Sequence, residues 1–108
     1  MNYDDFLDSL EADRPPAELD PWLEALWYAR KGDWDRAHRM VQALGDRKAA
    51  RIHAYLHRVE GDLWNSRYWH DRAGSRFPDH LSIEEEWSAL VKQALATPGQ
   101  DTFPENPA

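Results

Sequence analysis

Residues 25–45, ALWYARKGDWDRAHRMVQALG, and residues 54–74, AYLHRVEGDLWNSRYWHDRAG, decide the fold of this chain. Each stretch carries a Gly-Asp pair at the same place, Gly32-Asp33 and Gly61-Asp62, and the two pairs lie 29 residues apart. Glycine adopts the left-handed conformation that ends a helix, and the aspartate side chain then caps the next one. So short a link between helices makes them antiparallel. The sequence therefore predicts two successive helix hairpins.

Proline, glycine and capping residues predict the remaining boundaries. Pro15-Pro16 ends an amphipathic N-terminal helix, and Asp20-Pro21 begins the next helix. Ser82 and Glu85 form a capping box that begins the last helix. The expected helices span residues 2–13, 21–31, 33–44, 47–60, 62–73 and 83–96. We expect residues 98–108, which have few apolar residues and no periodicity, to be a flexible tail.

The two hairpins resemble the tetratricopeptide repeat (TPR) in the stretches Tyr28–Leu44 and His57–Ala73. In that family an aromatic residue precedes Gly-Asp-aromatic, and small residues recur on the second helix. The resemblance implies an all-α, TPR-like domain over residues 1–97, with repeats at about 19–45 and 48–74. The spacing of 29 residues is shorter than the ~34 of the family. We therefore expect a TPR-like pair of hairpins and not a regular superhelix.

Residues 52–62 and 68–74 are also similar to a family of short proteins without an established activity. This second resemblance implies nothing further about function.

Two repeats are fewer than the ~3 that usually make a stable stack, so the flanking helices should act as caps. We expect the N-terminal cap to cover the first hairpin through Phe6, Leu7 and Leu10. The C-terminal cap should cover the second hairpin through Trp87, Leu90, Val91 and Leu95. The predicted core residues are Leu23, Trp27, Ala37, Val41, Leu44, Ile52, Leu56, Leu63 and Leu90.

Composition narrows the function classes. The 108 residues include six tryptophans and no cysteine, which excludes disulfides, thiolate metal sites and thiol catalysis. No apolar run approaches the ~20 residues of a membrane helix, and the first residues do not read as a secretory signal. No phosphate-binding loop, dinucleotide fingerprint or nucleophile elbow is present. We expect a non-catalytic cytoplasmic protein that has no cofactor and does not bind membranes.

The net charge of −7 is unevenly distributed. Residues 30–76 hold eleven Arg and Lys against six acids, whereas both ends of the chain are acidic. The overall acidity argues against nucleic acid as a partner. One interpretation is that the acidic ends fold over the basic middle and neutralise it.

The TPR resemblance implies that the first helix of each hairpin lines a concave groove that receives a partner peptide. This face includes Trp22 and Arg30 in the first repeat. In the second repeat Lys48, Arg51, Tyr55 and Arg58 follow one another at intervals of 3, 4 and 3, so they form one helical stripe. Three cations around a tyrosine suit an acidic or carboxylate-ended peptide. The alternatives are that an acidic segment of the same chain covers the stripe, or that it is a solvated face.

Histidines provide an alternative function as a small metal-binding protein or metalloenzyme. His53 and His57 project from one face of a helix at a spacing that can hold a metal ion. His70 and Asp71, on the partner helix, could complete the site. The structural alternative is that these histidines only hydrogen-bond their neighbours within the helix interface.

Aromatic residues provide a third function, a self-associating scaffold or homodimer. Trp64 and Tyr68 share one helix face, and Trp69 points in another direction. Most rings at helical spacing belong to a core, but one helix cannot bury all of them. We expect at least one of these rings to be partly exposed and to mark a contact site.

Overall fold

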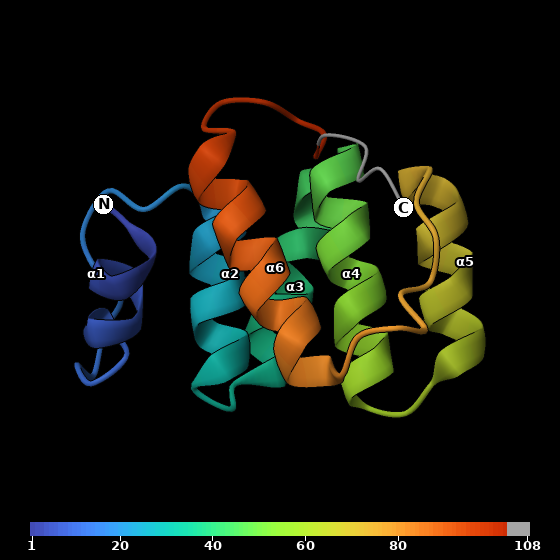
Figure 1. The fold of residues 1–108 in the computed structure, drawn as a ribbon, viewed down its shortest axis with the longest axis horizontal. Coiled ribbons are helices and arrows are strands. Elements are labelled where there is room, and N and C mark those ends of the chain that lie inside the picture. Colours follow the sequence, from blue (N-terminus) through green and yellow to red (C-terminus); the bar gives the residue numbers. More distant parts are fainter. Residues whose placement is uncertain (104–108) are drawn as a thin grey trace.

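The computed structural model describes residues 1–103, which form six α-helices and no strand (Figure 1). The helices are α1 (Tyr3–Ser9), α2 (Pro21–Arg30), α3 (Trp34–Leu44), α4 (Arg47–Val59), α5 (Leu63–Ala73) and α6 (Ile83–Ala96). The predicted all-α class with about six helices is confirmed. Residues 104–108, the end of the expected tail, lie outside the described residues.

Both Gly-Asp corners fold in the same way. Gly32 and Gly61 have φ angles of 88° and 84°. Residues with a Cβ atom rarely adopt this backbone conformation. The amide of the following aspartate donates to the carbonyl five residues earlier, at 2.9 Å in both repeats. The aspartate side chain then accepts from the third residue of the next helix. These corners pack α2 against α3 and α4 against α5, and α3 also packs against α4.

Helix α1 is shorter than predicted, because it ends at Ser9 and not near the Pro15-Pro16 pair. From Leu10 to Ala12 the amides donate to carbonyls three residues back, so the chain tightens into turns. The Ser9 hydroxyl donates to the Phe6 carbonyl and accepts from the Trp27 indole at 3.2 Å. The contact with Trp27 joins the end of α1 to α2.

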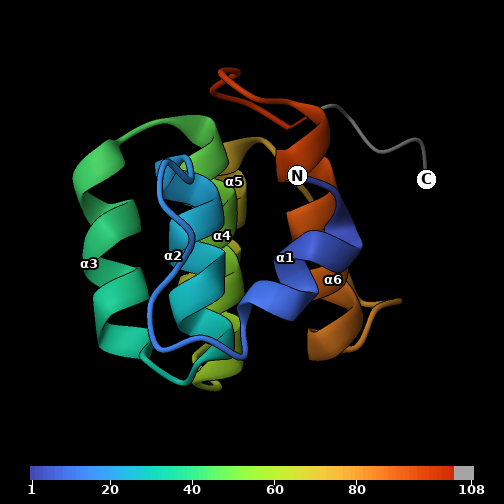
Figure 2. The ribbon, with the colours of Figure 1, turned by 90° about the vertical axis from the view of Figure 1, so that its left-hand side faces the viewer.

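Helix α6 packs against α2 and α4, the first helices of the two hairpins, and not against α5 (Figures 1 and 2). The prediction that α6 caps the second hairpin is therefore only partly right. Trp87 is buried, and its indole donates to the Leu26 carbonyl at 2.9 Å. Leu90 and Val91 are buried in the same layer. The face that the TPR resemblance assigns to a peptide is thus filled by the protein's own last helix.

Helix α1 covers the outer side of α6 (Figure 2). The ring of Phe6 is fully buried, with its centroid 6.0 Å from that of Trp87. Lys31, after α2, donates to the carbonyls of Leu10 and Ala12. The N-terminal cap therefore reaches the first hairpin mainly through α6 and the end of α2.

One predicted core residue is exposed. Leu63 is 48 % exposed, because α5 lies at the edge of the helix layer and nothing in residues 1–103 covers its outer face. The inward positions of α5 hold Ser66 and His70 instead. The Ser66 hydroxyl donates to the Ala54 carbonyl at 2.7 Å, which lets α5 approach α4 closely. Leu44 is partly buried against the core, and the other predicted core residues are buried: Leu23, Trp27, Ala37, Val41, Ile52, Leu56 and Leu90.

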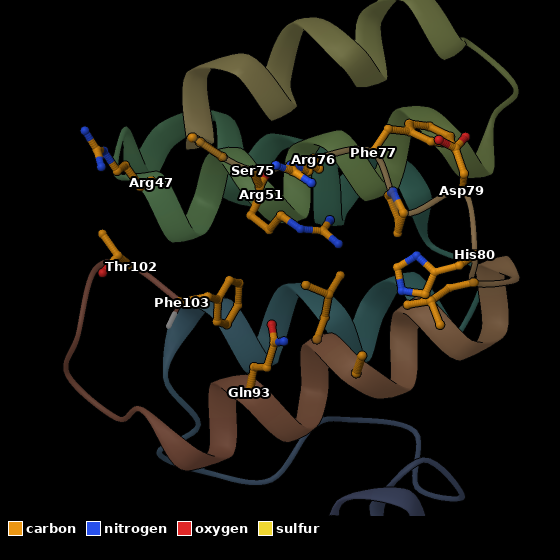
Figure 3. Close-up of a pocket in the computed structure, with 16 residues that line it drawn as sticks. Arg47, Arg51, Ser75, Arg76, Phe77, Asp79, His80, Gln93, Thr102 and Phe103 are labelled. Carbon is orange, nitrogen blue, oxygen red and sulfur yellow. The ribbon is translucent and has the colours of Figure 1, made fainter. Parts of the chain in front are cut away.

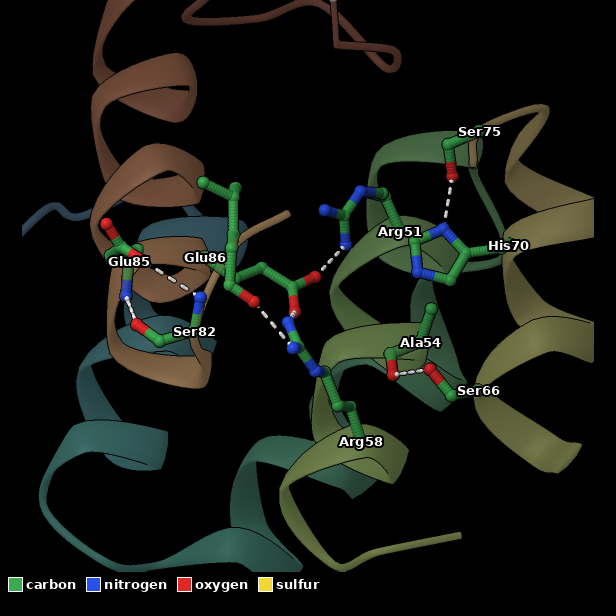
Figure 4. Close-up of polar contacts among 10 residues, drawn as sticks. Arg51, Ala54, Arg58, Ser66, His70, Ser75, Ser82, Glu85 and Glu86 are labelled. Atoms are coloured by element: carbon green, nitrogen blue, oxygen red, sulfur yellow. Dashed lines mark hydrogen bonds and ion pairs between the residues drawn. The ribbon is translucent and has the colours of Figure 1, made fainter. Parts of the chain in front are cut away.

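A buried ion triad fixes α6 on α4 (Figure 4). The Glu86 carboxylate is fully buried and accepts from Arg51 Nη1 at 2.6 Å and from Arg58 Nη1 at 2.9 Å. Arg58 Nη2 also donates to the Leu81 carbonyl, just before α6. A charge removed from water needs such partners, and Arg51 and Arg58 supply them where α6 meets α4.

The chain after α6 returns over the beginning of α4. Lys48 is fully buried, and its ammonium donates to the carbonyls of Thr97 and Gln100 at 2.8 and 3.3 Å. The Lys48 amide donates to the Asp101 carbonyl, and the Phe103 ring lies 5.2 Å from the ammonium. Residues 98–103 therefore contact the domain, although they were expected to begin a flexible tail.

Glu86→Gln should destabilise the fold by roughly 3 kcal/mol, because it leaves two partly buried guanidinium groups without a carboxylate. The measurement is the free energy of urea unfolding followed by circular dichroism. Glu84→Gln is the matched control, since Glu84 is exposed and 4.0 Å from Arg30. The control should leave stability unchanged within error. Equal effects of the two substitutions would contradict this role of Glu86.

Candidate functional site

The predicted cationic stripe is not an open surface. Lys48 and Tyr55 are buried, and both arginines of the stripe, Arg51 and Arg58, bond to Glu86 (Figure 4). Burial, and then the Glu86 charge, raise the pKa of Tyr55 to about 12. Of the three interpretations of this stripe, the structure agrees with the one in which an acidic segment of the same chain covers it. A peptide could lie along the whole stripe only if α6 and the segment after it moved away.

The two first-repeat residues of that face are engaged as well. The Trp22 indole donates to the Asp46 carboxylate at 3.0 Å, and the Trp22 ring faces the Lys48 ammonium at 4.5 Å. Arg30 is exposed, but its guanidinium lies 5.1 Å from the centre of the Trp87 ring. These contacts serve the packing of α6 and of the segment after it.

Three histidines meet on the other side of α4. His38 of α3 joins His53 and His57 of α4, and one ligand atom from each ring lies within 4.8 Å of the others. The Nε2 atoms of His38 and His53 are 2.9 Å apart, so one donates its proton to the other. His53 and His57 are buried, whereas His38 is half-buried. This is the one group of potential metal ligands in the described part of the chain that consists of histidines alone.

Aromatic rings and a carboxylate hold the three imidazoles in place. Trp34 stacks on His38 with ring centroids 4.7 Å apart, and Trp69 stacks on His53 at 3.9 Å. His57 Nδ1 lies 2.6 Å from a carboxylate oxygen of Glu60. Because a carboxylate only accepts, Nδ1 carries the proton of a neutral His57 ring, and Nε2 keeps its lone pair. His57, Glu60 and Asp62 form a second, overlapping group of potential ligands.

Burial keeps part of the cluster uncharged. It lowers the pKa of His53 to about 3, and the neighbouring His38 and His57 add to this effect. Burial and His57 also lower the pKa of His38. Both rings are therefore neutral at pH 7, which is the form of imidazole that binds metals.

Of the three histidines that the sequence singled out, His53 and His57 lie in this cluster, and its third member is His38, which was not predicted. The predicted third ligand, His70, lies outside the cluster and bonds to Ser75 at 2.8 Å (Figure 4). The spacing of Trp34, His38 and Val41 places all three on one face of α3. Together with the packing of α3 against α4, this pattern predicts that His38 faces α4.

At least one aromatic ring of α5 is exposed, as predicted. Trp64 is 76 % exposed and Tyr68 43 % exposed, and the two rings stack with centroids 6.2 Å apart. Trp69 turns inward onto His53. The outer face of α5 therefore carries the largest exposed ring among the described residues.

Comparisons with known proteins add no functional information, because no family model, curated protein or solved structure matches the chain. None of the described helices has the length and apolar character needed to cross a membrane.

His70 should make stability depend on pH. Burial, and then Arg51, Arg58 and Arg67, lower the pKa of His70 to about 3 from the ordinary value of 6.5. The unfolded chain therefore binds a proton that the folded chain excludes, so stability falls as pH drops below 6.5 toward 3. Between pH 6.5 and 5 the free energy of unfolding should fall by as much as about 2 kcal/mol.

Urea unfolding at pH 7 and pH 5 measures this effect. His70→Leu should lose less stability on acidification than the natural protein does. His80→Gln, which changes an exposed histidine, should retain the natural pH dependence. An unchanged pH dependence in His70→Leu would show that His70 does not contribute to it.

Proposed function

We propose that this protein binds a divalent transition-metal ion through His38, His53 and His57. The observation that supports the proposal is the convergence of three imidazoles from two helices, with ligand atoms within 4.8 Å of one another. In a tetrahedral zinc site with Zn–N bonds of ~2.0 Å, the nitrogens are about 3.3 Å apart. The His38–His53 separation of 2.9 Å is only slightly shorter. Small rotations of the rings would admit an ion.

The ligand type favours a particular group of metals. Imidazole nitrogen suits Zn²⁺, Ni²⁺ and Cu²⁺, whereas Mg²⁺ and Ca²⁺ prefer oxygen. Three histidines leave a fourth position for water or another ligand. Zn²⁺ is the ion that we expect first, because it accepts a tetrahedral arrangement without a strong geometric preference of its own.

Glu60 supports this assignment from outside the metal ligands. Its bond to His57 Nδ1 orients the ring and leaves Nε2 for the ion. Carboxylates in this position raise the basicity of a metal-binding histidine. Since Glu60 is engaged in that bond, we propose metal binding and assign no reaction.

The tryptophans on either side of the cluster restrict how the rings move. Trp34 is fixed by the bond from its indole to the Leu56 carbonyl at 2.7 Å, and it covers one face of His38. Trp69 covers His53. An ion would enter from the side of the half-buried His38.

The proposal predicts one Zn²⁺ bound per chain with micromolar or tighter affinity. Calorimetric titration of protein purified without a histidine tag and treated with chelator measures it. His38→Gln and His57→Gln should each weaken binding at least tenfold, because each removes a ligand. Glu60→Gln should weaken it about tenfold through the lost orientation of His57.

His80→Gln is the matched control and should bind Zn²⁺ normally, since His80 is exposed and outside the cluster. Circular dichroism of each variant separates loss of a ligand from loss of the fold. Failure of the natural protein to bind Zn²⁺ at 100 µM, or equal weakening by His80→Gln, would overturn the proposal.

Self-association is a second candidate function, supported by the exposed face of α5. Leu63, Trp64 and Tyr68 are each more than two-fifths exposed, and large exposed rings are typical of contact sites. Light scattering over a concentration series should give a mass that rises in the natural protein but not in Trp64→Ser. A constant monomer mass would exclude this function.

A further inference from the structure

A cleft of about 920 Å³ lies between α4, α6 and the loop of residues 74–81 (Figure 3). Arg51 and Arg76 extend toward its middle, and Gln93 and Phe103 face them from the opposite wall. Arg47 lies at one end, next to Gly74, and His80 lies at the other. Pockets of about 300–1,000 Å³ are the size that small molecules occupy.

The charge of this cleft is opposite to that of the whole protein. Three arginines line it, Arg47, Arg51 and Arg76, against the single acid Asp79, although the chain carries a net charge of −7. Arg47 and Arg76 are exposed and form no ion pair with another residue in the range 1–103. Arg47 and Arg51 also belong to the first two turns of α4, where the helix dipole adds positive potential.

The rest of the lining is apolar. Phe77, Leu81, Leu90 and Phe103 contribute aromatic and aliphatic surface beside the arginines. The Phe77 ring is held by the guanidinium groups of Arg58 and Arg67, which lie 5.0 and 4.7 Å from its centre. The cleft therefore combines a cationic part with an apolar part, and the two would contact different ends of one ligand.

We propose that this cleft binds a small organic dianion with an apolar, preferably aromatic, body. The doubly charged head, a phosphate monoester or a pair of carboxylates, suits the Arg76 guanidinium, which extends toward the middle of the cleft, and Arg47 adds positive charge at one end. Arginine forms paired hydrogen bonds with either kind of head. The apolar body lies against Phe77 and Leu90. None of these residues belongs to the histidine cluster, so this proposal is independent of metal binding.

Arg51 has a different role from the other two arginines. Its Nη1 bonds to the buried Glu86, which holds the guanidinium at the wall of the cleft. Glu86 also cancels part of its charge. Arg47 and Arg76 form no ion pair with another described residue, so these two supply most of the positive charge open to a ligand and can be changed without disturbing the triad that docks α6.

Phenyl phosphate is the probe that tests the proposal, titrated into the full chain and followed by two-dimensional amide NMR and calorimetry. We expect saturable shifts confined to residues 47–51, 74–81 and 89–103. Inorganic phosphate, which lacks the ring, should bind at least tenfold more weakly. Benzoate, with one charge, should also bind more weakly, and benzyl alcohol should give no saturable shift.

Arg47→Gln/Arg76→Gln should weaken phenyl phosphate binding at least tenfold. Arg14→Gln/Arg39→Gln removes the same charge from exposed positions outside the cleft and is the matched control. Absence of saturable binding up to 10 mM phenyl phosphate, or equal weakening in both double variants, would overturn the proposal. Tighter binding of benzoate than of phenyl phosphate would contradict the assignment of a dianion.

Discussion

The burial of one carboxylate, that of Glu86, determines how this small protein closes on itself. Two hairpins leave the apolar face of their first helices in water, so a further element has to cover it. Glu86 can leave water only where two guanidinium groups meet it, and Arg51 and Arg58 offer both on one face of α4. The two ion pairs thus tie α6 to this face of α4. Once α6 is fixed, Trp87 and Phe6 can pack in the same layer.

Helix α4 is therefore the centre of the molecule, and its two faces differ in chemistry. One face carries the arginines, Lys48 and Tyr55, and meets α6 and the segment after it. The other carries His53 and His57 and meets α3 and α5. A helix surrounded in this way is expected to be apolar all round, but α4 buries charged and polar groups on both sides. Lys48, Arg51, Arg58 and His53 each bond to a partner from another helix or loop, and α4 is the element from which both proposed sites are built.

The structure also changes what the repeat resemblance implies. The resemblance implies a partner on the first helices of the two hairpins, and α6 packs against these two helices, α2 and α4. The histidine cluster and the cationic cleft lie in different places, one between α3 and α4 and the other between α4 and α6. Neither follows from the repeat pattern, because both depend on residues that the repeat does not conserve between its two copies. His38 corresponds to Arg67 in the second copy, and Arg76 lies after it.

The six helices, the two glycine–aspartate corners and most of the core were predictable from the amino-acid sequence, because capping and periodicity act over fewer than five residues. Which helix faces meet became clear only from the packing of the helices. Three of these contacts join residues from separate helices: α6 lies against Arg51 and Arg58, Trp69 stacks on His53, and His38 approaches His53. A local pattern indicates which side of a helix is apolar but not which neighbour covers that side. Leu63 is an example, because it lies at an apolar position of α5 and is nevertheless exposed at the edge of the helix layer. The helices were therefore predictable and the candidate sites only in part, since each site requires the packing of elements far apart in the chain.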